Sequence, residues 1–198
     1  MDRNRLSKQL DFLREIDKVK SVFRNTVLLD KSRRENDAEH SWHMAVCAML
    51  FQEYANYNDL DMGKVLKMIM LHDIVEIYSG DTFAYDPAGR ETQTEREKLA
   101  ADKLFALLPD DQSKEFRALW DEFEECSTPE SKYAHLVDRF MPIYHNYVTQ
   151  GLKWREFGIT KSQVLNRNQN IKEGSEEIWN YVCEIVEDAV AKGYLKDD

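Results

Sequence analysis

The sequence predicts a single all-α domain, a compact multi-helix bundle, and three observations support this fold class. Apolar residues recur at helical spacing along most of the 198-residue chain. Helix-breaking residues are scarce, with seven glycines and four prolines. No two segments show the alternation of apolar and polar residues that is typical of paired strands. We expect one domain over residues 1–198, with a core over about 5–150 and a C-terminal helical extension over about 151–198.

The first part of the chain is expected to form two amphipathic helices joined by a link. Residues 5–22 place leucine, isoleucine and valine at helical intervals. Residues 26–32 follow as a loop or an extended link. Asn36 and Glu39 then have the spacing of a capping box, in which each side chain accepts from the other residue's backbone N–H group. A second helix should therefore begin here and run to about Asn56.

The next segment is expected to be one helix followed by a loop. Asp59 or Asp61 can cap this helix, which should end near Gly80 because glycine is common just past a helix C-terminus. Residues 83–89 contain a proline and a glycine and are expected to form a loop. The loop is either an ordinary connection or a lid over a neighbouring site, and composition does not separate these alternatives.

The rest of the chain is also predicted to be helical. Thr128 and Pro129 form a typical helix start, and Pro142 is expected to kink the helix that follows. The last helix, capped by Ser175, should serve packing or dimer contact, with an exposed apolar stripe that suggests a homodimer. The other predicted helices span about 91–108, 113–125 and 160–168.

The composition argues against several classes of protein. A net charge of −10 disfavours a surface for nucleic acid or anionic membranes, because both require a basic face. No run reaches the roughly 18 apolar residues of a membrane span, and the first residues lack the apolar segment of a secretory signal. Cys47, Cys126 and Cys183 are too few and too scattered for a disulfide framework. We therefore expect reduced thiols and a cytoplasmic protein.

His72 and Asp73 stand side by side in a strongly apolar segment that is expected to be helical. Neighbouring helix residues point about 100° apart, so the two side chains do not face each other, but both can reach a metal ion beside the helix. Glu76, at i+4 from His72 and i+3 from Asp73, shares that face. The alternative is a core histidine that is hydrogen-bonded to Asp73. Buried ionisable groups are costly unless they are paired or bound to metal, so both interpretations stay open at this point.

Two further residues could complete a metal site. His40 falls in the first turn of its predicted helix, and Asp138 lies on an otherwise apolar helix face. Two nitrogens and two carboxylates without a thiolate suit Mn²⁺, Co²⁺, Fe²⁺, Ni²⁺ or Zn²⁺. His43, one turn after His40, is expected to be structural or to support a ligand. His135 and His145 are expected in the core or at the surface.

Lys31, Arg33 and Arg34 form the first basic cluster of the chain. Such a triplet commonly lies in an exposed, solvated loop. Its proximity to His40 raises the alternative that these side chains bind phosphate, since arginine holds phosphate oxygens through paired hydrogen bonds.

In chain order the candidate ligands read H…HD…D, and this pattern resembles the HD-domain superfamily of metal-dependent phosphohydrolases. The stretches Arg33–Ser41 and His72–Asp81 are similar to the branch that contains the bacterial 5′-deoxynucleotidases and their eukaryotic relatives. The resemblance covers roughly residues 5–150. It implies an HD-type helical bundle.

The resemblance also implies roles for individual residues. Glu76 and Asp81 would lie in the active site beside the attacking water and the substrate. Relatives with two metals carry additional histidines between the HD pair and the last aspartate, where this chain has only His135, so we expect one divalent ion, with Mg²⁺ added to the candidates above. The residues that the resemblance implies as ligands of this ion are His40, His72, Asp73 and Asp138.

Arg24 falls close to the position where this branch has an arginine facing the phosphate, with Arg33 or Arg34 in reserve. The branch follows that arginine with a tryptophan, whereas this chain has Asn25. The departure concerns recognition of the sugar, and hence the preference for deoxyribose over ribose.

The resemblance implies a phosphomonoesterase that uses a metal-activated water to release phosphate from nucleoside or deoxynucleoside 5′-monophosphates. Two alternatives remain. One is another HD phosphohydrolase activity, on a nucleoside triphosphate or a different phosphate ester. The other is a regulatory module that binds nucleotide without turnover. The expected partners are a small-molecule phosphate ester and a second copy of the chain, with no nucleic acid and no membrane.

Overall fold

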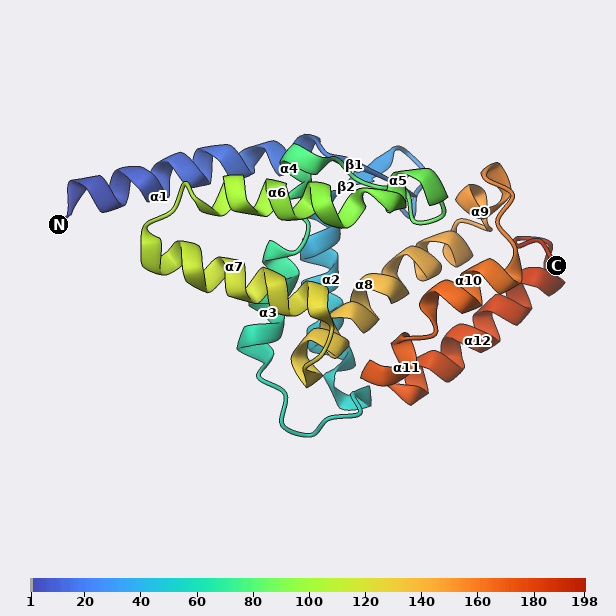
Figure 1. The fold of residues 1–198 in the computed structure, drawn as a ribbon. Coiled ribbons are helices and arrows are strands. Elements are labelled where there is room, and N and C mark those ends of the chain that lie inside the picture. The colour runs from blue at the N-terminus through green and yellow to red at the C-terminus, as the bar shows by residue number, and fades with distance from the viewer. Residues whose placement is uncertain (1) are drawn as a thin grey trace.

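The computed structural model describes residues 2–198 and confirms the predicted all-α fold (Figure 1). In chain order the elements are α1 (Arg3–Ile16), the 3-10 helix η1 (Asp17–Ser21), β1 (Phe23–Val27), β2 (Arg34–Asn36), α2 (Asp37–Phe51), the 3-10 helix η2 (Gln52–Tyr54), α3 (Met62–Leu71), α4 (Glu76–Ser79), α5 (Pro87–Glu91), α6 (Gln93–Phe105), α7 (Asp110–Glu125), α8 (Pro129–Val148), α9 (Leu152–Glu156), α10 (Lys161–Asn168), α11 (Ile171–Gly174) and α12 (Glu176–Ala191).

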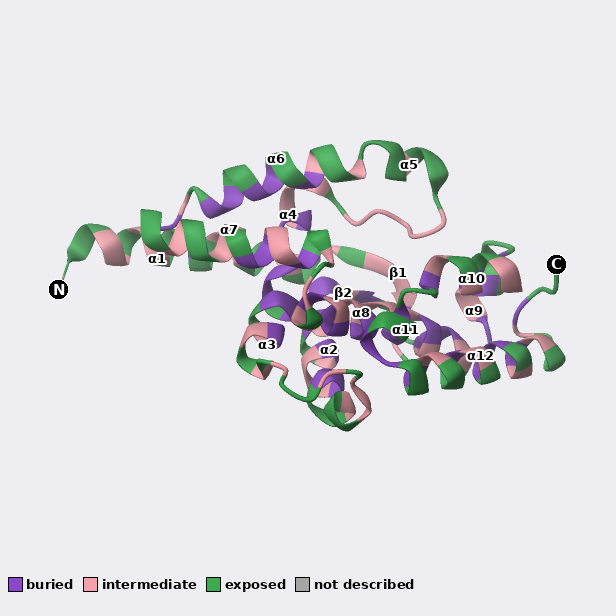
Figure 2. Ribbon diagram, turned by 60° about the horizontal axis from the view of Figure 1, so that its bottom comes forward, coloured by how far each residue is buried: buried purple, intermediate pink, exposed green. Residues whose placement is uncertain are grey.

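Helix α8 is the central element of the fold. It packs against α2, α3, α7, α11 and α12 (Figure 1). Figure 2 shows the buried residues gathered around α8 in the middle of the molecule. The helix continues through Pro142 to Val148. A single apolar core therefore surrounds the helix that carries Asp138.

The predicted helix caps are confirmed. Asn36 accepts from the backbone N–H of Glu39 at 3.0 Å, and the Glu39 carboxylate accepts from the N–H of Asn36 at 3.2 Å. Thr128 caps α8, and Ser175 caps α12. Caps are local interactions between near neighbours, which is why the sequence predicts them well. The capping box fixes the start of α2 and thereby places His40 in its first turn.

The expectation that the chain has no paired strands is wrong. β1 and β2 form an antiparallel hairpin in which Phe23 is opposite Asn36 and Val27 is opposite Arg34. The strands have five and three residues, which is too short for an alternating pattern to stand out. Most of the loop predicted over residues 26–32 is confirmed as the connection between the two strands, and the hairpin holds Arg24 and Glu35 beside the start of α2.

The single helix predicted up to Gly80 is interrupted at the His72–Asp73 pair. α3 ends at Leu71, and α4 begins at Glu76. The indole N–H of Trp120 donates to the carbonyl of His72 at 3.1 Å, while the N–H of Glu76 turns to the carbonyl of Asp73 at 2.9 Å. A contact with α7 thus takes the carbonyl that a continuous helix would use, and the chain tightens into a turn.

The exposed apolar stripe predicted for the last helix is also wrong. The apolar face of α12 is buried, because it packs against α8, α10 and α11. Large exposed apolar side chains lie instead on α2, where Trp42, Met49 and Leu50 are 64%, 55% and 65% exposed. Among the described residues, none of the helices is both long and apolar enough to cross a membrane.

Candidate active site

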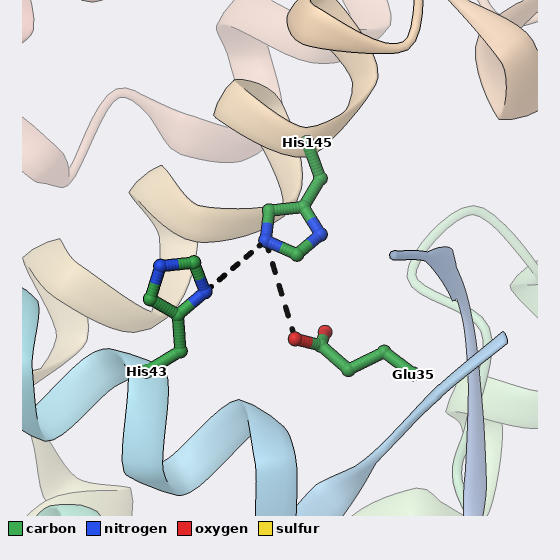
Figure 3. A group of neighbouring side chains, drawn as sticks. All are labelled: Glu35, His43 and His145. Atoms are coloured by element: carbon green, nitrogen blue, oxygen red, sulfur yellow. Dashed lines mark hydrogen bonds and ion pairs between the residues drawn. The ribbon is translucent and has the colours of Figure 1, made fainter. Parts of the chain in front are cut away.

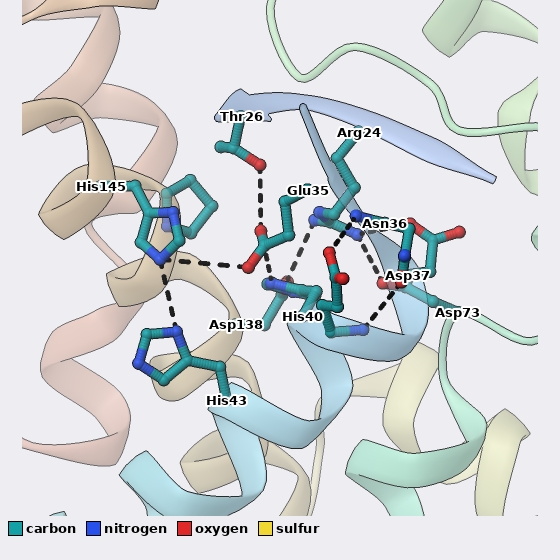
Figure 4. Close-up of polar contacts among 12 residues, drawn as sticks. Arg24, Thr26, Glu35, Asn36, Asp37, His40, His43, Asp73, Asp138 and His145 are labelled. Atoms are coloured by element: carbon teal, nitrogen blue, oxygen red, sulfur yellow. Dashed lines mark hydrogen bonds and ion pairs between the residues drawn. The ribbon is translucent and has the colours of Figure 1, made fainter. Parts of the chain in front are cut away.

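The structure brings the four candidate metal ligands together from three parts of the chain. His40 comes from α2, His72 and Asp73 from the turn after α3, and Asp138 from α8. His40 Nε2 lies 3.2 Å from Asp138 Oδ1, and His72 Nε2 lies 3.0 Å from Asp73 Oδ2. His72 Nε2 is 4.0 Å from Asp138 Oδ1. Figure 4 shows His40, Asp73 and Asp138 converging below the hairpin.

The donor atoms fit a divalent cation. His40, His72 and Asp73 are all buried, and each offers a ligand atom within 4.8 Å of the others. His72 Nδ1 lies 2.7 Å from the carbonyl of Ile69, which can only accept, so Nδ1 carries a proton and Nε2 is the ring nitrogen that faces the two carboxylates. This Nε2 is buried. A buried imidazole nitrogen beside two carboxylates is an arrangement that can bind a metal ion once Nε2 has lost its proton.

Arg24 reaches into the same cluster from β1. Its Nη1 lies 2.5 Å from Asp73 Oδ2 and 3.5 Å from Asp37 Oδ1, and its Nη2 lies 3.9 Å from Asp138 Oδ1. Burial alone would raise the pKa of Asp73, but His72 and then Arg24 outweigh burial and hold that pKa well below its ordinary value. Although burial opposes it, Asp73 raises the pKa of His72 to about 9. The carboxylates are therefore ionised and ready to bind a cation.

Three further carboxyl groups have a pKa that is raised instead of lowered. Burial raises the pKa of Glu76 well above its ordinary value, and Asp73 and Asp37 raise it further. Burial, followed by the charge of Asp73, raises the pKa of Asp37 to about 7. Burial also raises the pKa of Asp81. A site in which some carboxyl groups have a lowered pKa and others a raised pKa can both bind a cation and exchange protons.

A cavity of about 170 Å³ adjoins this cluster. Asp73, Glu76, Asp81 and Asp138 line it together with Arg24, and we call these four acids its acidic end. Residues 82–85 also line it, so the loop predicted after Gly80 does border the site. The other lining residues come from β1, α6, α8, α9 and α10, with Trp154 among them. The C-terminal extension is therefore part of the site.

The residues that were expected to contact the substrate separate into two groups. Arg24 and Asn25 line the cavity. Arg33 instead forms a bidentate ion pair with Glu39, at 2.8 and 2.6 Å. Arg34 donates to the backbone carbonyls of Phe23 and Arg24 across the hairpin. The expectation that Arg33 or Arg34 holds phosphate is thus corrected, because each side chain is engaged outside the cavity.

A second cluster lies behind His40 and consists of Glu35, His43 and His145 (Figure 3). His145 Nε2 lies 3.4 Å from His43 Nδ1 and 4.0 Å from Glu35 Oε1. The other oxygen of Glu35 lies 3.6 Å from His40 Nδ1 and accepts from the Thr26 hydroxyl at 3.1 Å. A carboxylate behind a ligating imidazole orients the ring and increases its basicity. This cluster therefore supports His40 from the side away from the cavity (Figure 4).

Sequence reasoning missed two of these acids and three basic residues. Asp37 follows a cap residue, where an acid is already explained by the helix dipole, and Glu35 precedes the cap in a strand that was not foreseen. The sequence around Asp37 and Glu35 does not indicate that these side chains are buried. The missed basic residues, which line the cavity far along the chain, are Arg139, Lys153 and Arg167.

In metal-free protein, stability should fall as the pH rises from about 4 to about 7, because Asp37, with a pKa of about 7, keeps a proton that the unfolded chain has already lost. Each pH unit in this window lowers the free energy of unfolding by at most about 1.4 kcal/mol. Asp37→Asn should remove this contribution. Urea unfolding of both proteins with a chelator at pH 5, 6, 7 and 8 measures it, and identical pH slopes would contradict the burial argument.

Comparison with known proteins agrees with this geometry. The family model described as "HD domain" matches residues 16–179. The crystal structure of a predicted metal-dependent phosphohydrolase from Magnetospirillum magnetotacticum MS-1 is 46% identical, with a TM-score of 0.92 over 96% of this chain and 95% of that one. An HD-domain phosphohydrolase from Listeria innocua, 15% identical with a TM-score of 0.61 over 94% of this chain and 92% of that one, shares the fold.

A curated relative is similar over part of the chain. The human protein named 5′-deoxynucleotidase HDDC2 is 31% identical over 131 residues, which are 66% of this chain and 62% of that protein. The matched region thus spans less than two thirds of that relative's length. The "HD domain" match covers most of the present chain and includes all four candidate metal ligands, so the protein belongs to the HD-domain family.

Proposed function

We propose that the protein is a metal-dependent phosphomonoesterase that acts on nucleoside 5′-monophosphates. The observation that carries this proposal is the convergence of His40, His72, Asp73 and Asp138 beside a cavity that Glu76 and Asp81 also line. Similarity to a protein named as a 5′-deoxynucleotidase supports the nucleotide as the substrate class.

The four converging residues would hold one divalent ion of the Mn²⁺, Co²⁺, Fe²⁺, Ni²⁺, Zn²⁺ or Mg²⁺ group. When bound, such an ion supplies Lewis acidity, lowers the pKa of water and offsets negative charge on the phosphoryl group. Glu35 keeps His40 oriented, and the carbonyl of Ile69 keeps His72 in the tautomer that presents Nε2 to the site.

The chain's own residues supply the proton transfers and one positive charge. As water attacks phosphorus, its proton passes to Asp81. The bond between phosphorus and the ester oxygen breaks, and Glu76, whose pKa is raised by burial, gives a proton to the departing oxygen. Arg24 lies in the cavity wall and offers its guanidinium to the phosphate oxygens. The products are inorganic phosphate and a nucleoside.

The site favours turnover over pure nucleotide binding. A regulatory module needs the ligand set but has no use for two carboxyl groups that exchange protons in the same cavity, and both Glu76 and Asp81 line it. Attack on another phosphate ester, including a nucleoside triphosphate, uses the same chemistry and is therefore the alternative substrate class.

The test is phosphate release from a panel of ribo- and deoxyribonucleoside mono- and triphosphates. Metal-stripped protein is assayed with Mn²⁺, Co²⁺ or Mg²⁺ added back. We expect metal-dependent release from the monophosphates, and the deoxy-to-ribo ratio measures the effect of Asn25, which lines the cavity where the resemblance has a tryptophan. Release from triphosphates alone would establish the alternative substrate, and no release from any nucleotide would refute the proposal.

We also propose a cytoplasmic homodimer. The three cysteines are unpaired, as expected of reduced thiols. The exposed apolar side chains of α2, namely Trp42, Met49 and Leu50, replace α12 as the support for self-association. Sedimentation velocity distinguishes a dimer from a monomer directly.

A further inference from the structure

The cavity also has basic lining residues. Arg139 on α8 and Arg167 on α10 both line it, and we call this pair the arginine wall. Lys153 on α9 lines the cavity too, but its ammonium lies 2.8 Å from the Glu156 carboxylate. Arg139 directly follows the candidate ligand Asp138 on α8, whereas Arg167 belongs to the C-terminal extension.

Neither guanidinium of the arginine wall has an acidic partner. Among residues 2–198, no carboxylate oxygen lies within 4.0 Å of Arg139 or Arg167. Arg24, by contrast, is paired with Asp73, and Arg33 with Glu39. The charge of the arginine wall is therefore not balanced within the chain.

The hydrogen bonds of the two arginines are also incomplete. Arg139 donates from Nη1 to the backbone carbonyl of Arg167 at 2.7 Å, but its Nε is buried without a partner. The guanidinium of Arg167 lies 6.0 Å from the ring centre of Tyr85 and makes no hydrogen bond in the described chain. Burial lowers the pKa of Arg167, and the charges of Arg139 and then Arg90 lower it further. Both side chains thus retain donors for an external anion.

Unpaired guanidinium groups held partly out of water are unfavourable unless a ligand supplies hydrogen-bond acceptors and negative charge. Arginine presents parallel N–H donors that match phosphate oxygens, and its charge is independent of pH in the physiological range. The acidic end of the same cavity already accounts for one phosphate, through the candidate metal ligands and Arg24. We therefore expect the ligand to carry a second anionic group that contacts the arginine wall.

We propose that the arginine wall binds a second phosphate group of the substrate, so that the preferred substrate is a nucleotide with two phosphates rather than a simple monophosphate. This inference rests on the proposed function, because it takes the scissile phosphate to lie at the acidic end. The second phosphate can be carried on the ribose, as in a nucleoside 3′,5′-bisphosphate, or in the 5′ chain, as in a nucleoside 5′-diphosphate. Both present the same chemistry to Arg167.

The first experiment compares kcat/KM for a nucleoside 5′-monophosphate, the 3′,5′-bisphosphate and the 5′-diphosphate of the same nucleoside. We expect at least one of the doubly phosphorylated substrates to exceed the monophosphate by about tenfold or more, as charge-assisted hydrogen bonds to phosphate require. Arg167→Gln should reduce this ratio toward one, mainly through KM. Arg155→Gln, an exposed arginine on α9 outside the cavity lining, is the matched control and should keep the ratio.

Calorimetry tests the arginine wall without turnover. The doubly phosphorylated nucleotides are titrated into metal-loaded Glu76→Gln protein, in which hydrolysis is expected to be slow, with and without Arg167→Gln. We expect Arg167→Gln to weaken binding of the preferred nucleotide about tenfold or more. Equal weakening for monophosphate and doubly phosphorylated ligands, or none for either, would overturn the inference. If the unmodified protein releases no phosphate but Arg167 still contributes to binding of the doubly phosphorylated nucleotides, the proposed function is wrong and the arginine wall keeps its assigned role.

Discussion

Replacing Asp73 with asparagine should abolish metal binding and lower kcat/KM for the preferred nucleotide by on the order of 10³-fold. Asp73 Oδ2 lies 3.0 Å from His72 Nε2 and 2.5 Å from Arg24 Nη1, so its negative charge holds the His72 ring and the Arg24 guanidinium in place. Asparagine keeps the shape but removes the negative charge that binds the ion. Metal content by mass spectrometry and phosphate release are both measured after dialysis against Mn²⁺.

The control for this variant is Asp121→Asn. Asp121 pairs with Arg117 at 2.8 Å on the exposed side of α7, away from the cavity. Its replacement should leave metal content and activity within about twofold of the parent, since exposed ion pairs contribute little. Full metal occupancy in Asp73→Asn would show that the ion binds elsewhere.

Glu76→Gln should lower kcat by roughly 10²- to 10⁴-fold while the protein keeps its metal. Glu76 lines the cavity and is buried, and burial raises its pKa, which favours the protonated form. Glutamine fills the same space but has no acidic proton for the departing oxygen. Substrates with a more acidic leaving group need this proton less, so the loss should shrink for p-nitrophenyl phosphate.

Glu97→Gln is the matched control for this second variant. Glu97 is also buried and also has a pKa raised by burial, but it accepts from Gln93 at 2.8 Å and does not line the cavity. We expect its replacement to change kcat less than tenfold. Normal turnover in Glu76→Gln would move the role of proton donor to another residue.

Local chemistry explains what could be predicted from the sequence. The Asn36–Glu39 capping box, the cap at Thr128 and the cap at Ser175 depend on residues three positions apart, so the pattern itself fixes them. The convergence of His40 with the His72–Asp73 turn followed from the family resemblance. The spacing along the chain did not reveal it.

Contacts between distant segments explain what could not be predicted. The chain turns at His72 because Trp120, 48 positions later, donates to its carbonyl, and no local pattern reveals that bond. The hairpin that carries Arg24 and Glu35 has strands too short to show alternation. The helix that carries Arg167 was foreseen, but periodicity alone does not show which of its polar residues turns toward the cavity.

The span of chain between the ligands links metal affinity to folding. His40 and Asp138 are 98 positions apart, so their 3.2 Å approach exists only after α2, α3 and α8 have packed. An ion held there binds the native state and not the unfolded chain, and it shifts the folding equilibrium by mass action. The supply of metal would then set how long the protein survives as well as how fast it works.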